Sequence, residues 1–245
     1  MITRIVFCIF VFSLIHQRLT AQFNDTTHHK INASFSGNFN HISDGVTYLL
    51  NNSLQYGFKD KDLVLNAGAK WLYGANPQKQ TNNDFNASLD GNLYKTFPHF
   101  YYWGLLHFTS SYSLRINQQT QAGAGVAYRF IDKKDMMLSI SDGFLYEYSN
   151  IINEESNNFV YETVRNSLRL QYRYSYRDRI HYRFTGFYQP SLQYGNDYIV
   201  SVVSSVNVKL WKWLAANASF TYNKITRTDR ENLLITYGIV AERFF

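Results

Sequence analysis

The sequence predicts an all-β fold, a transmembrane antiparallel up-and-down β-barrel of about twelve strands. The first observation behind this prediction is a period-two alternation of apolar and polar side chains that recurs along most of the chain. The second is composition, because the chain holds 20 Tyr and 19 Phe but only 3 Pro. The third is that no stretch beyond the N-terminal segment approaches the ~18 consecutive apolar residues of a membrane-spanning helix. Strands with one lipid-facing side and one lumen-facing side have this diluted apolarity.

Residues 1–21 are expected to form a signal peptide that is cleaved. Arg4 supplies a positive charge, residues 5–15 form an apolar run, and the junction of Ala21 and Gln22 is a suitable cleavage site. The apolar run is shorter than the ~20 residues that span a bilayer, so a membrane anchor is the weaker alternative. The signal indicates export from the cytoplasm.

The exported chain is expected to have two parts, a short periplasmic lead at residues 22–29 and a single barrel domain at residues 30–245. Cys8 is the one cysteine of the chain and leaves with the signal peptide, so no disulfide or thiol chemistry is expected. The formal net charge of +6 is mild for 245 residues. Charge therefore gives no reason to expect a nucleic-acid partner.

Twelve segments show the alternation in sequence order. The first six each carry an apolar face, marked in turn by Phe35, Leu54, Leu65, Leu89, Leu106 and Val126. The second six carry one marked in turn by Ile140, Leu170, Tyr182, Val202, Phe220 and Ile235. The expected strands are 30–40, 47–59, 62–73, 84–95, 99–115, 119–131, 136–150, 161–177, 179–189, 197–211, 213–225 and 233–245.

The connections between these segments fall into a short class and a long class that alternate. Outer-membrane barrels have short periplasmic turns and longer external loops. The alternation therefore predicts an even number of strands with both termini in the periplasm. The short connections are 60–61, 131–134, 178 and 212, and the long ones are 74–83, 151–160, 190–196 and 226–232.

The polar face of the segments consists mostly of Asn, Ser, Thr, Gly and Gln. A soluble β-sandwich is the alternative fold, and its solvated face would be richly charged. An uncharged polar face suits an enclosed lumen better, which favours the barrel.

The last segment alternates up to the end of the chain, with Leu233, Ile235, Tyr237 and Phe245 on one face. This pattern resembles the closing strand of bacterial outer-membrane barrels, in which a C-terminal Phe is part of the signal read by the barrel-assembly machinery. Phe245 is accordingly the expected assembly signal. The lipid bilayer and that machinery are the expected partners.

Three stretches carry a resemblance to a known family. They read AGAGVAYRFID at residues 122–132, LSISDGFLYEYSN at 138–150 and LRLQYRYSYRDRIHYRFTGFYQPSL at 168–192. They resemble the DUF481 family, which contains salt-induced outer-membrane proteins of Gram-negative bacteria. The resemblance implies an outer-membrane β-barrel and says little about activity. The Thr-Ala-Gln end of the signal peptide also resembles secreted proteins of Bacteroidetes.

A ladder of basic residues marks the segment 161–177. Its four arginines alternate with apolar residues, and turning them toward lipid would cost ~2–4 kcal/mol each near the bilayer midplane. They are therefore expected to face the lumen, together with Arg183 and His181 on the matching face of the next segment. The ladder consists of Arg165, Arg169, Arg173 and Arg177.

Two roles for the ladder stay open. A basic pore lining attracts anions and repels cations, so the ladder would select small anionic solutes. The alternative is that the arginines fill the interior by pairing with lumen acids, for which the candidates are Glu147, Glu242 and Asp90. A barrel of twelve strands lies between filled and open sizes, so strand number does not decide.

Other features point weakly to chemistry. Alternation places Asp142 on the outward face, where a β-bulge at residues 141–143 or an interfacial position would accommodate it. A lipid hydrolase would need a Ser activated by a His, and His107 and Ser111 share a lumen face without forming a specific motif. His28 and His29 are too few for a metal site. No cofactor, metal or catalytic residue is expected, and the chain is not expected to be an enzyme.

Three functions follow from this reading of the sequence. The first is a small passive pore or envelope-integrity protein of the outer membrane, which the family resemblance links to osmotic or salt stress. The second is a closed structural barrel that docks partners through its loops. The third is an outer-membrane hydrolase of lipid or lipopolysaccharide.

Overall fold

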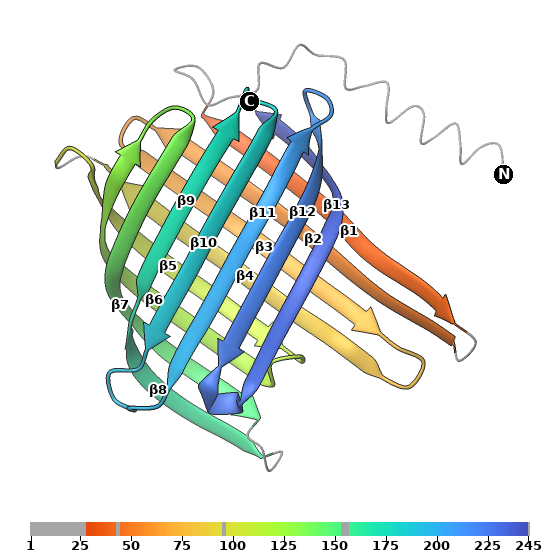
Figure 1. Cartoon of the computed structure of the whole chain (residues 1–245). Coiled ribbons are helices and arrows are strands. Elements are labelled where there is room, and N and C mark those ends of the chain that lie inside the picture. The colour runs from red at the N-terminus through yellow and green to blue at the C-terminus, as the bar shows by residue number, and fades with distance from the viewer. Residues whose placement is uncertain (1–27, 43–44, 95–96, 153–156, 245) are drawn as a thin grey trace, which may run out of the picture.

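The computed structural model describes residues 28–42, 45–94, 97–152 and 157–244. These residues form one antiparallel sheet that closes on itself, since β6 pairs with β7 as well as with β5 (Figure 1). Consecutive strands pair with each other, except that β8 and β9 both pair with β7, and β1 pairs with β13. The strands are β1 His29–Ile42, β2 Gly45–Asp60, β3 Leu63–Ala75, β4 Gln80–Leu93, β5 Phe100–Ser111, β6 Ile116–Asp132, β7 Met136–Ile152, β8 Asn158–Asn166, β9 Leu168–Tyr176, β10 Ile180–Pro190, β11 Tyr198–Lys209, β12 Leu214–Ile225 and β13 Arg230–Phe244, with a short 3-10 helix, η1, at Thr226–Thr228.

The thirteenth strand arises because the expected strand 161–177 is divided at Ser167. Both halves keep one register on β7, where Phe144 faces Asn166 and Ser141 faces Arg169. The Ser167 amide donates to the carbonyl of Gly143 at 2.8 Å, so the ladder continues across the division. The prediction of a closed antiparallel barrel of about twelve strands is confirmed, with β8 as one extra strand.

Several expected boundaries were wrong by a few residues. The expected strand 99–115 ends at Ser111, because residues 112–115 form a turn. Three of the four long connections are shorter than expected, because the strands run further than the apolar pattern does. β3 continues to Ala75 and β4 begins at Gln80, which leaves residues 76–79 as the connection.

The connections separate into two ends of the barrel. The turn end carries the start of β1, the end of β13 and the connections that follow β2, β4, β6, β9 and β11, while the loop end carries those that follow β1, β3, β5, β7, β10 and β12 (Figure 1). All four connections predicted to be long lie at the loop end.

The two faces of the wall differ in polarity as the alternation predicts. Large apolar side chains on the outer face are exposed, as with Phe35, Leu106 and Ile235. The buried polar side chains point inward, among them Gln121, Ser139 and Thr163. The interior is therefore a polar core inside an apolar shell, which is the inverse of a soluble domain.

Candidate lumen site

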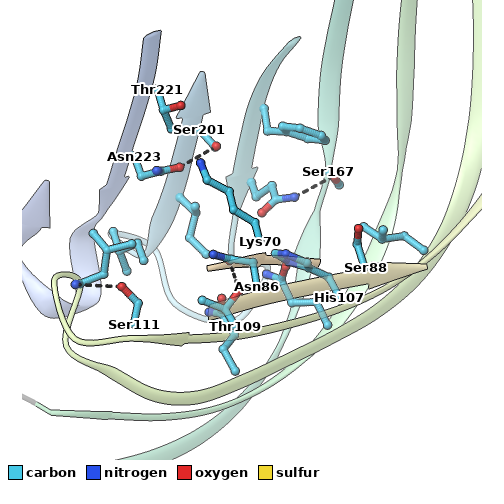
Figure 2. Close-up of a pocket in the computed structure, with 18 of the residues that line it drawn as sticks. Lys70, Asn86, Ser88, His107, Thr109, Ser111, Ser167, Ser201, Thr221 and Asn223 are labelled. Atoms are coloured by element: carbon cyan, nitrogen blue, oxygen red, sulfur yellow. Dashed lines mark hydrogen bonds between the residues drawn. The ribbon is translucent and has the colours of Figure 1, made fainter. Parts of the chain in front are cut away.

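A cavity of about 470 Å³ occupies the barrel interior. Most of its polar lining is uncharged, with the Lys70 and His107 side chains directed into it from β3 and β5 (Figure 2). Alternation brings these groups together, because every second residue of each strand faces the lumen. Residues of ten strands line the cavity, among them Lys70, Asn86, His107, Arg169, Ser201 and Thr221.

The loop end of the cavity is bounded by apolar side chains that we call the loop-end plug. They come from the β5–β6 turn, β6, β7, β8, β11 and β12 and pack as one buried cluster. Four of them also line the cavity, so the plug forms its floor. The plug consists of Leu114, Ile116, Ile151, Tyr161, Ile199 and Ile225.

The β5–β6 turn is folded across the lumen and held there. Asp84 on β4 accepts hydrogen bonds from the Ser111 hydroxyl at 2.8 Å, and from the Ser113 amide and hydroxyl at 2.9 and 2.7 Å. On the other side, the Asn232 amide of β13 donates to the Ser113 hydroxyl at 3.1 Å. Four strands separate β13 from β5 in the sheet order. The turn therefore spans the lumen and places Leu114 in the plug.

A buried charge network lies beside the plug. Arg165 forms a two-point ion pair with Glu147, through Nε to Oε2 at 2.8 Å and Nη2 to Oε1 at 3.1 Å. Its Nη2 also lies 3.0 Å from both carboxylate oxygens of Asp197. Arg227 of η1 donates to Asp197 Oδ2 through Nε at 2.9 Å and Nη2 at 2.8 Å. The Arg165 and Glu147 side chains are 0% exposed.

The network satisfies its members fully. Glu147 also accepts hydrogen bonds from the Tyr161 hydroxyl at 2.7 Å and from Gln121 Nε2 at 2.7 Å. The Arg227 guanidinium lies 4.1 Å from the Tyr161 ring centroid and 4.3 Å from that of Tyr194. Two cations balance two anions, which is the condition under which burying charge is tolerated.

A second inward arginine of this wall, Arg169, has a different environment. Its Nε donates to Ser141 Oγ at 2.9 Å, and its guanidinium lies 5.7 Å from the Trp103 ring centroid and 6.0 Å from that of Phe187. Arg169 lines the cavity, as do Trp103 and Phe187. This arginine therefore contributes positive charge to the cavity wall.

Two glycines make room for Trp103. A Cβ at Gly125 or Gly143 would lie 2.7 or 2.6 Å from Trp103 Cζ2. The Gly143 Cβ would also collide with the carbonyl oxygen of Ala124. The indole ring therefore packs against a part of the wall that has no side chains, which accounts for Gly125 in the run 122–132 and Gly143 in the run 138–150.

Gly143→Ala is expected to destabilise the barrel by about 1–3 kcal/mol, because the added methyl overpacks the wall under Trp103. Urea unfolding of the protein refolded in lipid vesicles, followed by Trp fluorescence, measures the change. Gly186→Ala is the matched control, since its Cβ would meet no atom closer than the Phe184 ring at 3.4 Å. Equal unfolding midpoints for the two variants would refute this account of Trp103.

The predicted basic ladder is divided among several environments. Arg165 belongs to the buried network and Arg169 to the cavity. Arg173 and Arg183 face each other across β9 and β10 nearer the turn end. Arg177 lies in the β9–β10 turn with its guanidinium 5.1 Å from the Tyr176 ring centroid. The Nδ1 atom of the sixth basic residue, His181, is 3.0 Å from Ser175 Oγ.

The candidate acid partners also differ from one another. Glu147 contacts Arg165 as described, whereas Asp90 Oδ2 accepts from the amides of Asn66 at 2.8 Å and Asn92 at 3.4 Å. Glu242 lies in β13, and its side chain is outside the described residues. The expected cleavage site at Ala21 and Gln22 and the expected assembly signal Phe245 are also outside the described residues.

The suggestion of a β-bulge at Asp142 was wrong. The β6–β7 register runs unbroken from Ala127 opposite Ser141 to Gly125 opposite Gly143. Asp142 keeps its outward place, and its Oδ1 accepts a hydrogen bond from Asn166 Nδ2 at 2.8 Å. A neighbouring amide, rather than a change of backbone, accommodates the carboxylate.

The pair considered for hydrolysis is not arranged as a nucleophile and its base. The Ser111 hydroxyl donates to Asp84 and accepts from the Leu114 amide at 3.2 Å. These bonds hold the β5–β6 turn, which is a structural role. Among the described residues, no group of three or more His, Cys, Asp and Glu side chains is placed to hold a metal ion.

Sequence reasoning missed Asp84, Trp103, Asp197 and Arg227. Asp84 and Trp103 occupy inward positions of strands that were predicted, so alternation gave their direction but not their partners. Asp197 begins the expected strand 197–211 but lies in the β10–β11 connection, just before β11, and Arg227 lies in η1 between β12 and β13, so strand alternation predicts the partners of neither. No helix among the described residues is long and apolar enough to cross a membrane.

Solved structures share this fold at low sequence identity. A NanC porin is 8% identical with a TM-score of 0.53, covering 89% of this chain and 99% of its own. The translocator domain of the autotransporter NalP from Neisseria meningitidis is 12% identical with a TM-score of 0.51, covering 94% and 91%. The COG4313 outer membrane channel from Pseudomonas putida F1 is 7% identical with a TM-score of 0.50, covering 92% and 100%.

The search of curated proteins finds no match. The family model for DUF481, described as a protein of unknown function, matches residues 43–233. This range covers the strands from β2 to β12 and the first residues of β13, and it leaves out β1. The chain therefore belongs to the DUF481 family.

Proposed function

We propose that the chain is an integral β-barrel of the outer membrane that acts as a small passive pore for polar solutes, with both termini in the periplasm. The apolar outer face supports membrane insertion, because exposed side chains such as Phe35, Leu106 and Ile235 would otherwise meet water. The observation that carries the pore proposal is the polar cavity of about 470 Å³ in the lumen. A barrel that served only as a scaffold would not need a polar cavity in its interior.

The loop-end plug favours a second candidate, a closed barrel that docks partners. Its six apolar side chains fill the loop end of the lumen, and Asp84 and Asn232 hold the β5–β6 turn in place. A passive pore would need this turn to move. The two candidates therefore differ in whether the plug opens.

Single-channel recording of the refolded protein in a planar bilayer tests the pore. We expect discrete conductance steps separated by long silent periods, because the plug is closed in the described arrangement. The control is the same protein heat-denatured before addition. If the folded barrel shows no conductance, either as the native chain or after the plug is loosened, the pore is refuted. The closed barrel that docks partners is then the supported function.

A part in envelope integrity under osmotic or salt stress belongs to the same proposal. A strain that lacks the protein is expected to grow more slowly at high salt, and complementation with the intact gene restores growth. Equal growth of the two strains across a series of salt concentrations would refute the role in envelope integrity under salt stress.

A further inference from the structure

We propose that Arg169 and Trp103 form a binding site inside the lumen cavity for a small solute that bears an oxyanion, a carboxylate or a phosphate. This inference deepens the proposed pore by naming the solute class, and it rests on that proposal for its biological meaning. The binding itself can be tested without conduction.

The first argument is an arginine whose hydrogen-bonding capacity is only partly used by the protein. Arg169 Nε donates to Ser141, but Nη2 is buried and has no hydrogen-bond acceptor among the described residues. The ion pairs formed within the described ranges join Asp and Glu to Arg129, Arg165 and Arg227, and none includes Arg169. A guanidinium presents its donors in a planar fork that matches a carboxylate or a phosphate.

The second argument is a second donor of the same kind nearby. Trp103 is 7% exposed, and its Nε1 has no acceptor within the described part of the chain. A buried donor without an acceptor costs about as much as a lost hydrogen bond, so such groups are rare unless something occupies them. Trp103 and Arg169 both line the cavity, and 5.7 Å separates the guanidinium carbon from the indole centroid.

The third argument is that the position of these groups is built into the fold. Gly125 and Gly143 leave space for the indole, and Ser141 and Phe187 orient the guanidinium. Because the Nη2 and Nε1 atoms are themselves buried, a ligand in the cavity meets them only after the side chains that cover them shift. Arg165 on the same wall shows the contrast, because Glu147 and Asp197 already use its donors.

The rest of the cavity suits the polar body of such a solute. Asn86, Ser88 and Thr109 line it from one side, and Thr221 and Asn223 from the other (Figure 2). These groups both donate and accept hydrogen bonds. A volume of about 470 Å³ lies within the range of small-molecule sites, about 300–1,000 Å³. The site therefore has a positive end at Arg169, and Lys70, Asp84 and Asp90 line other parts of the same cavity among uncharged polar side chains.

The test is isothermal titration calorimetry of the intact barrel in detergent micelles, with inorganic phosphate and acetate as probes and chloride as the reference anion. We expect saturable binding of at least one oxyanion above the chloride background. Arg169→Gln is expected to weaken that binding tenfold or more. Trp103→Phe keeps the ring and removes only the N–H, and is expected to weaken it about fivefold to tenfold.

Arg179→Gln is the matched control, because it removes one positive charge from the turn end and leaves the cavity lining intact. It is expected to bind as the native chain does. Unchanged binding in Arg169→Gln, an equal loss in Arg179→Gln, or no binding beyond chloride would overturn the site. Preference for phosphate or for acetate identifies which oxyanion source the site accepts.

The outcome is separable from that of the proposed pore. Oxyanion binding without conductance would refute the pore and retain the site. Conductance without oxyanion binding would refute the site and retain the pore. Heat-modifiable migration on gels establishes that each variant is folded before it is titrated.

Discussion

Arg165→Met is expected to destabilise the barrel by about 3–5 kcal/mol, the cost of breaking a buried ion pair by removing one partner. The change leaves Glu147 buried without its two-point ion pair, while Asp197 keeps only Arg227. Methionine has a similar length and fills the space, so the loss reports on charge rather than on a void. Unfolding in urea from lipid vesicles measures the change.

The double variant Arg165→Met with Glu147→Leu is the control for this interpretation. It removes one cation and one anion together and leaves the Asp197–Arg227 pair intact. Replacing a buried ion pair by apolar residues is often close to neutral, so most of the stability is expected to return. A double variant as unstable as the sum of the two single ones would show that the residues contribute independently.

Loosening the loop-end plug is expected to give the largest change in conductance. Leu114→Asn with Ile225→Asn places two amides in a buried apolar cluster that forms the floor of the cavity. Because the amides lack fixed partners there, water is expected to enter the cluster and the β5–β6 turn to leave the lumen more often. Open probability in planar bilayers is expected to rise at least tenfold.

Leu105→Asn is the matched control for the plug. Leu105 also lines the cavity, but it packs against the buried cluster of Tyr101, Trp103, Ala127 and Leu145 rather than in the plug. Conductance of this variant is expected to stay near that of the native chain. If both variants opened the channel equally, the general polarity of the lumen, and not the plug, would control passage.

The fold could be predicted from the sequence because the residues of each strand alternate between apolar side chains on the outer face and polar side chains on the lumen face. Alternation placed Phe35 and Leu106 outward and Arg165 and Arg169 inward, and the structure has all four as expected. The division at Ser167 could not be predicted. It arises because β10 ends at Pro190 while β7 continues to Ile152, which is a property of neighbouring strands.

The different environments of the four arginines were also beyond the sequence. Arg165 and Arg169 are both arginines of the regularly spaced ladder, and both face the lumen. The two arginines differ in whether a carboxylate contacts them. Asp197 reaches Arg165 from the β10–β11 connection. Ser141 and Trp103 surround Arg169 instead. The alternation within one strand predicts which face a residue occupies. It does not predict contacts with residues on other strands or in the loops.

The buried charge network also bears on how the barrel enters its membrane. In the proposed orientation the termini stay in the periplasm, so Glu147, Arg165, Asp197 and Arg227 must all pass through hydrocarbon to reach the loop end. A single charged side chain costs ~2.5–3.5 kcal/mol at the bilayer centre. Paired in advance, the four carry no net charge. The segment from β7 to β13 is therefore expected to translocate as one preassembled unit, rather than hairpin by hairpin.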